Sequence, residues 1–310
     1  MFDLVGVGNP VYDSIITPFS RTNGRVLSGC STNACLAARK LGLHKVGLVG
    51  CVGPDYRAKF ETEMNDFGIE VSVDTTGKGT GGFHLVYDEK GNRTLEVLGI
   101  AGPITPKSFP DKFLRARFMI VGPIMGEVDR GLMEFLRSST SSKLFLDPQG
   151  LIRTIGHNNR IVHKCDRDEF AKIAQEVDFI KPNEHESRTI TGEADPVLAL
   201  GRLREMGAAV AIITLAERGS LLLENGKLRR IPPYPTRAVD PTGAGDVYAG
   251  SFITRYLRAG SLAESSLYAS AAASIKVEQV GPGFRLSDKV VLERVDVIRD
   301  RTVTEGVQYE

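Results

Sequence analysis

The sequence has no hydrophobic run long enough to cross a membrane. Its longest apolar stretches, such as Ala208–Leu215, fall far short of the ~20 residues that a membrane-spanning helix needs. The first residues, Met1–Pro10, lack the basic segment, apolar run and small-residue cleavage site of a signal peptide. We therefore expect a cytoplasmic protein that has no membrane partner.

An excess of charge of either sign is also missing. The 39 lysine and arginine residues nearly balance the 38 aspartate and glutamate residues, which leaves a formal net charge of +1. The sequence has no basic stripe of the kind that tracks a phosphate backbone. We therefore expect no nucleic-acid partner.

Cysteine and histidine are too few and too scattered for a metal site. The cysteines form no C-x-x-C pair, and the histidines lack metal-ligand spacing. The sequence therefore predicts free, buried thiols in a reducing compartment and no structural metal. The residues concerned are Cys30, Cys35, Cys51 and Cys165, with His44, His84, His157, His163 and His185.

What the sequence does have is the composition of a folded α/β domain. Its 310 residues are 42% hydrophobic and 25% charged, which suits one large core. The apolar run Phe2–Val7 indicates a buried strand, Ser31–Lys40 an amphipathic helix capped by Ser31 or Thr32, and Lys45–Val52 a second strand. A right-handed crossover makes these strands parallel neighbours.

The same alternation resumes after residue 117. Apolar runs alternate there with helix-like segments, so we expect a mostly parallel sheet with helices on both faces. The predicted strands are Phe118–Gly122, Lys143–Asp147, Val177–Lys181 and Ala209–Thr214, with a hairpin of Ser220–Leu223 and Lys227–Ile231; the predicted helices are Arg130–Arg137, Asp168–Glu176, Pro196–Met206, Ala244–Arg258 and Leu262–Val277.

A second hairpin interrupts this order. Gly82–Tyr87 and Arg93–Leu98 flank the polar turn Asp88–Asn92 and indicate two antiparallel strands. Together with residues 11–27, the segment 79–101 is expected to form a small β lid on a single domain that spans residues 1–310. The lid's exposed strand edges favour pairing with a second lid, so we predict a homodimer.

A glycine-rich turn, residues 240–245, leads into the predicted helix at Ala244. The first N–H groups of a helix lack intrahelical partners, and glycine lets an anion approach the backbone. Gly243, Ala244 and Gly245 are therefore expected to cradle a phosphate. Asp246 would repel that anion unless it takes a proton from an attacking hydroxyl. The alternative is that Asp246 only stabilises the first helical turn.

Asp240-Pro-Thr-Gly-Ala-Gly-Asp246 resembles the D-T-x-G-A-G-D signature of the ribokinase-like (PfkB) family, and the resemblance extends along nearly the whole chain. It implies a ribokinase-like α/β fold and a kinase that transfers a phosphoryl group from a nucleotide, ATP or ADP, to a hydroxyl of a sugar or nucleoside. In the family's pattern Asp246 is the catalytic base, residues 243–245 form the anion hole, and Asp240 contacts the acceptor. Pro241 replaces the usual Thr and is expected to stiffen the turn.

The segment Ser28–Ala34 is similar to the family's G-G-x-x-x-N-x-A sugar-binding sequence, with Cys30 in place of the second glycine. The resemblance implies that Gly29 and Asn33 contact the acceptor. Asp13 resembles the family's early acidic ligand for a hydroxyl. A buried carboxylate and amide need such polar partners.

The segment Lys181–Ser187 resembles the family's N-x-x-E motif at Asn183 and Glu186. Side chains three residues apart can share one face of a starting helix and hold a hydrated Mg²⁺ near the nucleotide phosphates. The resemblance also implies that Asn183 contacts the nucleotide. A capping box, with Asn183 as the cap and Glu186 three residues later, is the alternative.

Further nucleotide contacts are implied at residues 214–219, which resemble the family's T-x-G-x-x-G turn. Thr214 and Gly219 match it, whereas Ala216 stands where the first glycine belongs. Asp147-Pro-Gln149 resembles a family strand end near the active site. Arg153, close behind it, either meets a phosphate or faces solvent. Arg93 and Arg153 together leave room for a phosphorylated sugar as the acceptor.

Other functional classes fit less well. A dinucleotide-binding fingerprint would need a third glycine after Gly6-Val-Gly8, at the position of Val11. A P-loop would need Ser or Thr after Gly226-Lys227. A sugar-phosphate or cyclitol kinase of the same family, and a non-catalytic sugar or nucleotide sensor, remain the alternatives.

Overall fold

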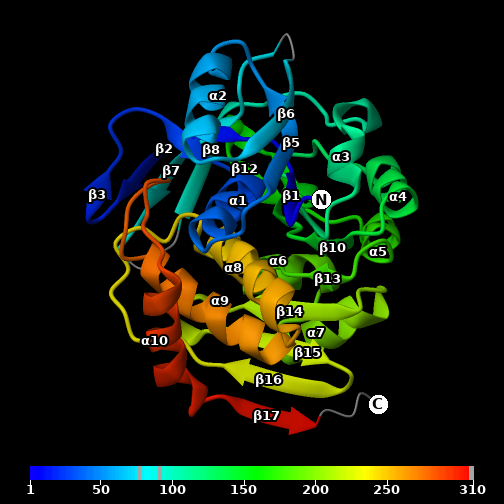
Figure 1. Cartoon of the computed structure of the whole chain (residues 1–310), viewed down its shortest axis with the longest axis vertical. Coiled ribbons are helices and arrows are strands. Elements are labelled where there is room, and N and C mark those ends of the chain that lie inside the picture. The colour runs from blue at the N-terminus through cyan, green and yellow to red at the C-terminus, as the bar shows by residue number, and fades with distance from the viewer. Residues whose placement is uncertain (76–77, 90–92, 307–310) are drawn as a thin grey trace.

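The computed structural model describes residues 1–75, 78–89 and 93–306. One sheet of ten strands runs through the molecule in the order β17-β16-β15-β14-β13-β10-β9-β1-β5-β6 (Figure 1). The strands from β14 to β6 are parallel, and β15 to β17 add an antiparallel edge. This confirms the predicted sheet. The strands are β1 Leu4–Val7, β5 Val46–Val52, β6 Glu70–Thr75, β9 Phe118–Val121, β10 Lys143–Leu146, β13 Phe179–Ile180, β14 Val210–Thr214, β15 Ser220–Glu224, β16 Lys227–Ile231 and β17 Val303–Gly306.

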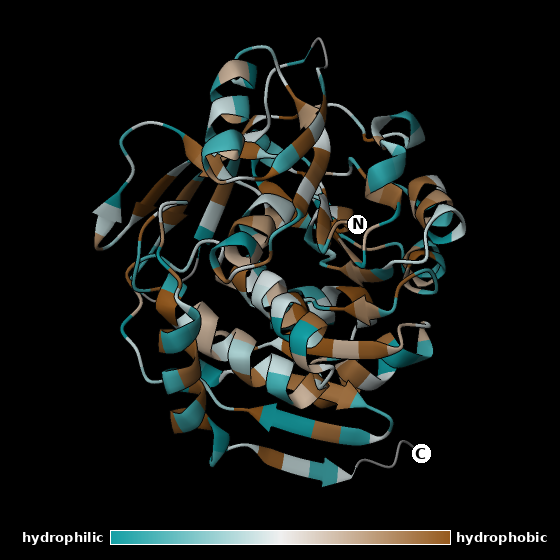
Figure 2. Ribbon diagram, in the orientation of Figure 1, coloured by the Kyte–Doolittle hydropathy of each residue, from teal (hydrophilic) through white to brown (hydrophobic). Residues whose placement is uncertain are grey.

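Both faces of the sheet are buried. In β9, Phe118 and Ile120 join one apolar core, and Met119 and Val121 join the other, because successive side chains of a strand point to opposite faces. Figure 2 shows largely hydrophobic strands at the sheet centre and hydrophilic residues on the outer turns of the helices. The first core packs against α1 Cys30–Lys40, α2 Arg57–Asp66, α8 Ala244–Ala259, α9 Leu262–Lys276 and α10 Asp288–Arg299; the second packs against α3 Asp111–Leu114, α4 Arg130–Ser139, α5 Arg167–Ala174, α6 Glu184–Thr191 and α7 Pro196–Glu205.

A smaller sheet stands beside the main one, at the left of Figure 1. Its central pairing is β2 with β7, which are parallel, and β7 continues into the predicted antiparallel hairpin with β8. The predicted turn Asp88–Asn92 lies partly outside the described residues. We keep the name lid for this sheet, which consists of β2 Val11–Thr17, β3 Ser20–Arg21, β4 Val26–Ser28, β7 Gly82–Tyr87 and β8 Arg93–Gly99.

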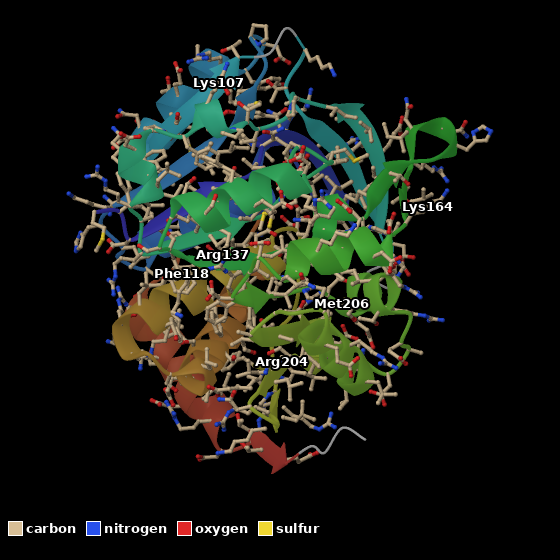
Figure 3. The ribbon with its side chains drawn as sticks, turned by 90° about the vertical axis from the view of Figure 1, so that its right-hand side faces the viewer. Lys107, Phe118, Arg137, Lys164, Arg204 and Met206 are labelled. Atoms are coloured by element: carbon tan, nitrogen blue, oxygen red, sulfur yellow. The ribbon has the colours of Figure 1, made fainter. Side chains whose placement is uncertain are left out.

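A third β element, which the sequence did not predict, lies against the lid. The antiparallel strands β11 Arg153–Ile155 and β12 Ile161–His163 form a two-stranded ribbon. A bridge between Glu96 and Arg160 links this ribbon to β8. The chain leaves the ribbon at Lys164, labelled in Figure 3, whose N–H donates to the carbonyl of Ile152 at 2.8 Å.

The start of α1 differs from the prediction. Gly29 is the N-cap, with a φ of 118° and no side-chain cap bond, whereas Ser31 and Thr32 lie inside the helix. The Ser31 hydroxyl instead donates to the Val7 carbonyl of β1 at 2.8 Å. The predicted cap at Ser31 or Thr32 is therefore wrong, because that hydroxyl ties the helix to the sheet.

The helices of the described residues include none that is both long and apolar enough to span a membrane.

Candidate active site

A cavity of about 750 Å³ opens between the lid and the ends of the parallel strands. Asp147 follows β10, Lys181 follows β13 and Thr214 ends β14, so the cavity lies at the carboxyl edge of the sheet, where open α/β sheets bind ligands. It gathers most of the predicted site from distant parts of the chain. The predicted residues that line it are Asp13, Gly29, Asn183, Glu186, Thr214, Gly219, Gly243, Ala244, Gly245 and Asp246.

Asp240 is the first predicted residue that the cavity leaves out. It is fully buried behind the turn, where one carboxylate oxygen accepts from Thr242 N–H at 2.9 Å and the other accepts from Gly281 N–H at 3.2 Å. Lys276 Nζ lies 3.6 Å from the second oxygen. These bonds to both oxygens hold the turn in place, and the contact of Asp240 with the acceptor stays a prediction.

The glycine-rich turn leads into α8 at Ala244, as predicted, and its role as an anion cradle stays a prediction. Gly243 caps α8 at a φ of 77°, and a Cβ added there would lie 2.9 Å from Asn33 Nδ2. No L side chain fits that position without strain. The Ala244 N–H bends back to the Pro241 carbonyl at 3.2 Å. The Ala244 N–H is therefore engaged within the turn. The backbone of Gly243 and Gly245 is the part of the predicted anion cradle that remains available.

Asp246 lies in the first turn of α8 and faces the cavity. Its Oδ2 accepts from Asn33 Nδ2 at 2.9 Å. Burial and then the negative charge of Asp147 raise the pKa of Asp246, against the opposing effects of Asn33 and Lys181. Asn33 is not among the residues that line the cavity, and its contact with the acceptor stays a prediction. Its amide orients the Asp246 carboxylate.

A buried ion pair that the sequence reasoning missed lies beside the cradle. Lys181 Nζ is 2.8 Å from Asp147 Oδ2, and both side chains are almost fully buried. A Cβ added at Gly245 would lie 3.4 Å from the same Nζ, so the ammonium group borders the anion cradle. Asp147 and Glu186 raise the pKa of Lys181, although burial alone would lower it. Lys181 therefore stays charged where a phosphoryl group would lie.

Cys30 is the second feature that was missed. Its Sγ and carboxylate oxygens of Asp147 and Asp246 lie within 4.8 Å of one another. Burial, followed by these two negative charges, raises the pKa of the Cys30 thiol. The thiol is free and buried, as predicted, but it also lines the cavity next to the candidate base. Cys30 stands where the sequence motif has its second glycine. That substitution was the feature of the sequence that could have drawn attention to it.

The N-x-x-E segment forms a capping box, which the sequence analysis gave as the alternative to a magnesium site. Asn183 Oδ1 accepts from Glu186 N–H, and Glu186 Oε2 accepts from Asn183 N–H, both at 2.9 Å. Burial and then Asp147 raise the pKa of Glu186, and Lys181 counters them. Both residues also line the cavity, so capping does not remove them from the site.

The predicted nucleotide turn keeps its shape despite the missing glycine. Ala216 has a φ of 52° and Gly219 a φ of 89°, and both line the cavity with Thr214. A left-handed conformation is the one that a glycine would adopt freely. Ala216 therefore holds, at some cost in strain, a backbone conformation that favours glycine.

The lid bonds directly to the glycine-rich turn and to Val239, which precedes it. Thr242 Oγ1 donates to the Tyr87 hydroxyl at 3.1 Å, and Thr17 Oγ1 donates to the Val239 carbonyl at 3.0 Å. Asp13, on the lid's inner side, accepts from Phe83 N–H at 2.8 Å, and burial raises the pKa of Asp13 to about 6. The lid thus presents a buried carboxylate to the cavity. Arg153 lines the same space and is buried, so it does not face solvent.

Comparison with known proteins agrees with this geometry. A family model described as pfkB family carbohydrate kinase matches residues 20–289. A cytidine kinase of Thermococcus kodakarensis is 29% identical over 85% of this chain and 92% of its own length. A ribokinase of Haemophilus influenzae is 34% identical over 82% of this chain and 81% of its own.

Solved structures share the fold. A pyrophosphate-dependent kinase in the ribokinase family superposes with a TM-score of 0.80 at 21% identity, covering 94% of this chain and 99% of that one. Ribokinase from Thermotoga maritima superposes with a TM-score of 0.76 at 20% identity, covering 96% and 100%. The chain belongs to the pfkB family of carbohydrate kinases and is a phosphotransferase that acts on a sugar or nucleoside hydroxyl.

Proposed function

We propose that this chain transfers the terminal phosphoryl group of a nucleotide, ATP, to a hydroxyl of a sugar or nucleoside held between the lid and the main sheet. The observation that carries the proposal is the position of Asp246. It faces the cavity at the start of α8, directly after the glycine cradle, and Asn33 fixes its carboxylate at 2.9 Å. A general base must be held in this way beside the group that it deprotonates.

In the proposed reaction, Asp246 accepts the proton of the acceptor hydroxyl. The hydroxyl oxygen forms a bond to the terminal phosphorus, and the bond from that phosphorus to the bridging oxygen breaks, which releases the nucleoside diphosphate. The backbone at Gly243 and Gly245 and the Lys181 ammonium hold the negative charge of the transferring group. Asp13, with its pKa raised by burial, is placed to bind another acceptor hydroxyl.

The donor side of the proposal consists of Thr214, Ala216 and Gly219 with Asn183, all of which line the cavity. Glu186 uses Oε2 in the capping box, and its other carboxylate oxygen meets no protein donor among the described residues. This free oxygen fits a water bound to a hard cation. Charge neutralisation at the phosphates would come from Mg²⁺, held by Glu186 and Asn183 through water.

The lid completes the proposal by covering the acceptor, because water must be kept from competing with the hydroxyl. Its bonds at Thr17 and Tyr87 to Val239 and the glycine-rich turn support this role. We also retain the homodimer through the lid as part of the proposal. Phe19, Val86 and Leu98 are exposed apolar side chains on the lid, and a second lid would cover them.

A transfer assay separates this kinase from a non-catalytic sensor. The protein is incubated with ATP and Mg²⁺ against a panel of sugars, nucleosides, cyclitols and sugar phosphates, and both nucleoside diphosphate and phosphorylated product are measured. Acceptor-dependent release of diphosphate in equal amount to the product is expected. Binding of a panel member and of ATP, with no product at any acceptor concentration, would support the sensor and contradict the kinase.

A further inference from the structure

The inner side of the lid carries one arginine. Side chains alternate along β7 and β8, so Phe83, Leu85 and Tyr87 share the inner face with Leu95 and Arg93. Arg93 lies opposite Tyr87 in the register and hydrogen-bonds its side chain. All of these residues line the cavity. The guanidinium of Arg93 is therefore directed at the cavity, and not at the outer surface of the lid.

A second arginine reaches the same region from the β11–β12 ribbon. Arg153 is 7% exposed, and its Cζ lies 5.5 Å from the centre of the Phe83 ring. Its Nη1 donates to the Ile124 carbonyl at 3.2 Å, and its Nη2 donates to Gln149 Oε1 at 2.5 Å. Its Nε is buried without a hydrogen-bond partner. A buried N–H of this kind is destabilising unless a ligand satisfies it.

The carboxylates of Glu186 and Asp246 attract both guanidinium groups without pairing with either. Neither forms an ion pair within the part of the chain that the structure describes. Burial and then the positive charge of Arg93 lower the pKa of Arg153, so the two groups lie close enough to repel each other. A guanidinium carries five N–H donors, and the bonds of Arg153 to Ile124 and Gln149 use only its two Nη groups. The site therefore offers two guanidinium groups with unused donors.

We propose that Arg93 and Arg153 bind a phosphate group already present on the acceptor, so that the substrate is a phosphorylated sugar. This inference rests on the proposed function and narrows its acceptor. A phosphate dianion matches two positive charges, and its oxygens suit the fork of a guanidinium group. Asp13 would then hold a hydroxyl of the same sugar, since it shares the lid's inner side with Arg93. The product would carry two phosphate groups.

Matched acceptor pairs test this proposal with ATP and Mg²⁺. The pairs are ribose and ribose 5-phosphate, fructose and fructose 6-phosphate, and myo-inositol and a myo-inositol monophosphate, with gluconate as a carboxylate-bearing probe. We expect kcat/KM to be at least 10-fold higher for the phosphorylated member of one pair or more. Arg93→Met and Arg153→Met should each lower kcat/KM for that acceptor about 10- to 100-fold, mainly through KM.

Controls keep the outcome interpretable. Arg21→Met removes an exposed lid arginine that does not line the cavity, and it should preserve the preference. Because Arg153 is buried, Arg153→Met could also destabilise the fold. The conservative variant Arg153→Lys is therefore measured beside it, together with the melting temperature of each variant. The acceptor's affinity, measured by calorimetry without nucleotide, should fall with Arg93→Met and with rising salt.

Three results would overturn the proposal. Transfer to neutral sugars with no gain from a phosphate would remove the anionic acceptor while leaving the kinase intact. A higher kcat/KM for gluconate than for every sugar phosphate would show that the two arginines bind a carboxylate and not a phosphate. A rise in the KM for ATP alone in the two arginine variants would assign the pair to the donor. Absence of transfer to every acceptor would contradict the proposed function itself.

Discussion

Replacement of Asp13 by asparagine should separate what the lid carboxylate does for binding from what it costs in stability. Asp13 is 3% exposed, and burial raises its pKa from 3.8 to about 6. The folded protein then holds this proton more tightly than the unfolded chain does. Stability from this group is therefore fully present below about pH 4 and is lost as the pH rises through 6. At 1.36 kcal/mol for each pKa unit, the ionised carboxylate costs about 3 kcal/mol.

The asparagine side chain carries no charge and keeps an oxygen that can accept the Phe83 N–H now bonded to Asp13 at 2.8 Å. At pH 8 we expect the free energy of unfolding of Asp13→Asn to exceed that of the wild type by up to about 3 kcal/mol. Near pH 4 the two free energies should be equal. Urea unfolding at several pH values measures the difference, and Asp66→Asn, at an exposed site, serves as the control. A difference that does not change with pH, or a less stable variant at pH 8, would contradict a stability cost of the ionised Asp13 carboxylate. Acceptor KM should rise in the same variant.

Two other substitutions test the groups around the cradle. Glu186→Gln keeps an acceptor oxygen for the capping bond to Asn183, so the melting temperature should move by less than about 2 °C, while kcat falls at least ~10-fold and the Mg²⁺ requirement rises. An unchanged Mg²⁺ titration would leave Glu186 with the capping role alone. Lys181→Met leaves the buried Asp147 carboxylate without its ion-pair partner and should lower the free energy of unfolding by about 3–5 kcal/mol. Adding Asp147→Asn should recover most of that stability but not the transfer rate; recovery of both would contradict a role for Lys181 at the transferring group.

Much of the fold followed from periodicity in the sequence. The strands of the parallel sheet are short apolar runs between turns, and a sheet covered on both faces needs such runs. Helix α10 was missed although Val291, Val295 and Ile298 mark its buried side at helical spacing. Helix α2 gave a weaker signal, since Phe60 and Met64 are its only buried residues.

Strand β17 and the β11–β12 ribbon were harder to predict. All residues of β17 are exposed, and its position depends on the edge that β16 provides. The ribbon's strands carry little buried surface of their own. Elements of this kind are set by their neighbours in the folded protein, and local sequence holds little information about them.

The sequence predicted which residues belong to the candidate site better than it predicted which groups they contact. The turn and Asp246 could be identified because a glycine-rich helix start has a specific chemistry. Asn33 and Asp240 were expected to touch the acceptor, yet each bonds to protein groups around the turn. Lys181 was overlooked because its role depends on Asp147, 34 residues away in the sequence and 2.8 Å away in space. Such pairings arise from the strand order β9-β10-β13, which sequence alone does not fix.

The central claim is that Asp246 takes the proton of the acceptor hydroxyl, and one measurement tests it most directly. The turnover of Asp246→Asn is compared with that of the wild type at saturating acceptor and ATP, while calorimetry records ATP affinity for both. Asparagine can still accept the Asn33 hydrogen bond through its own oxygen, so the fold and the cradle should persist. We expect kcat to fall ~10²-fold or more, with ATP affinity within about threefold of the wild type. Comparable turnover in the variant would contradict the claim.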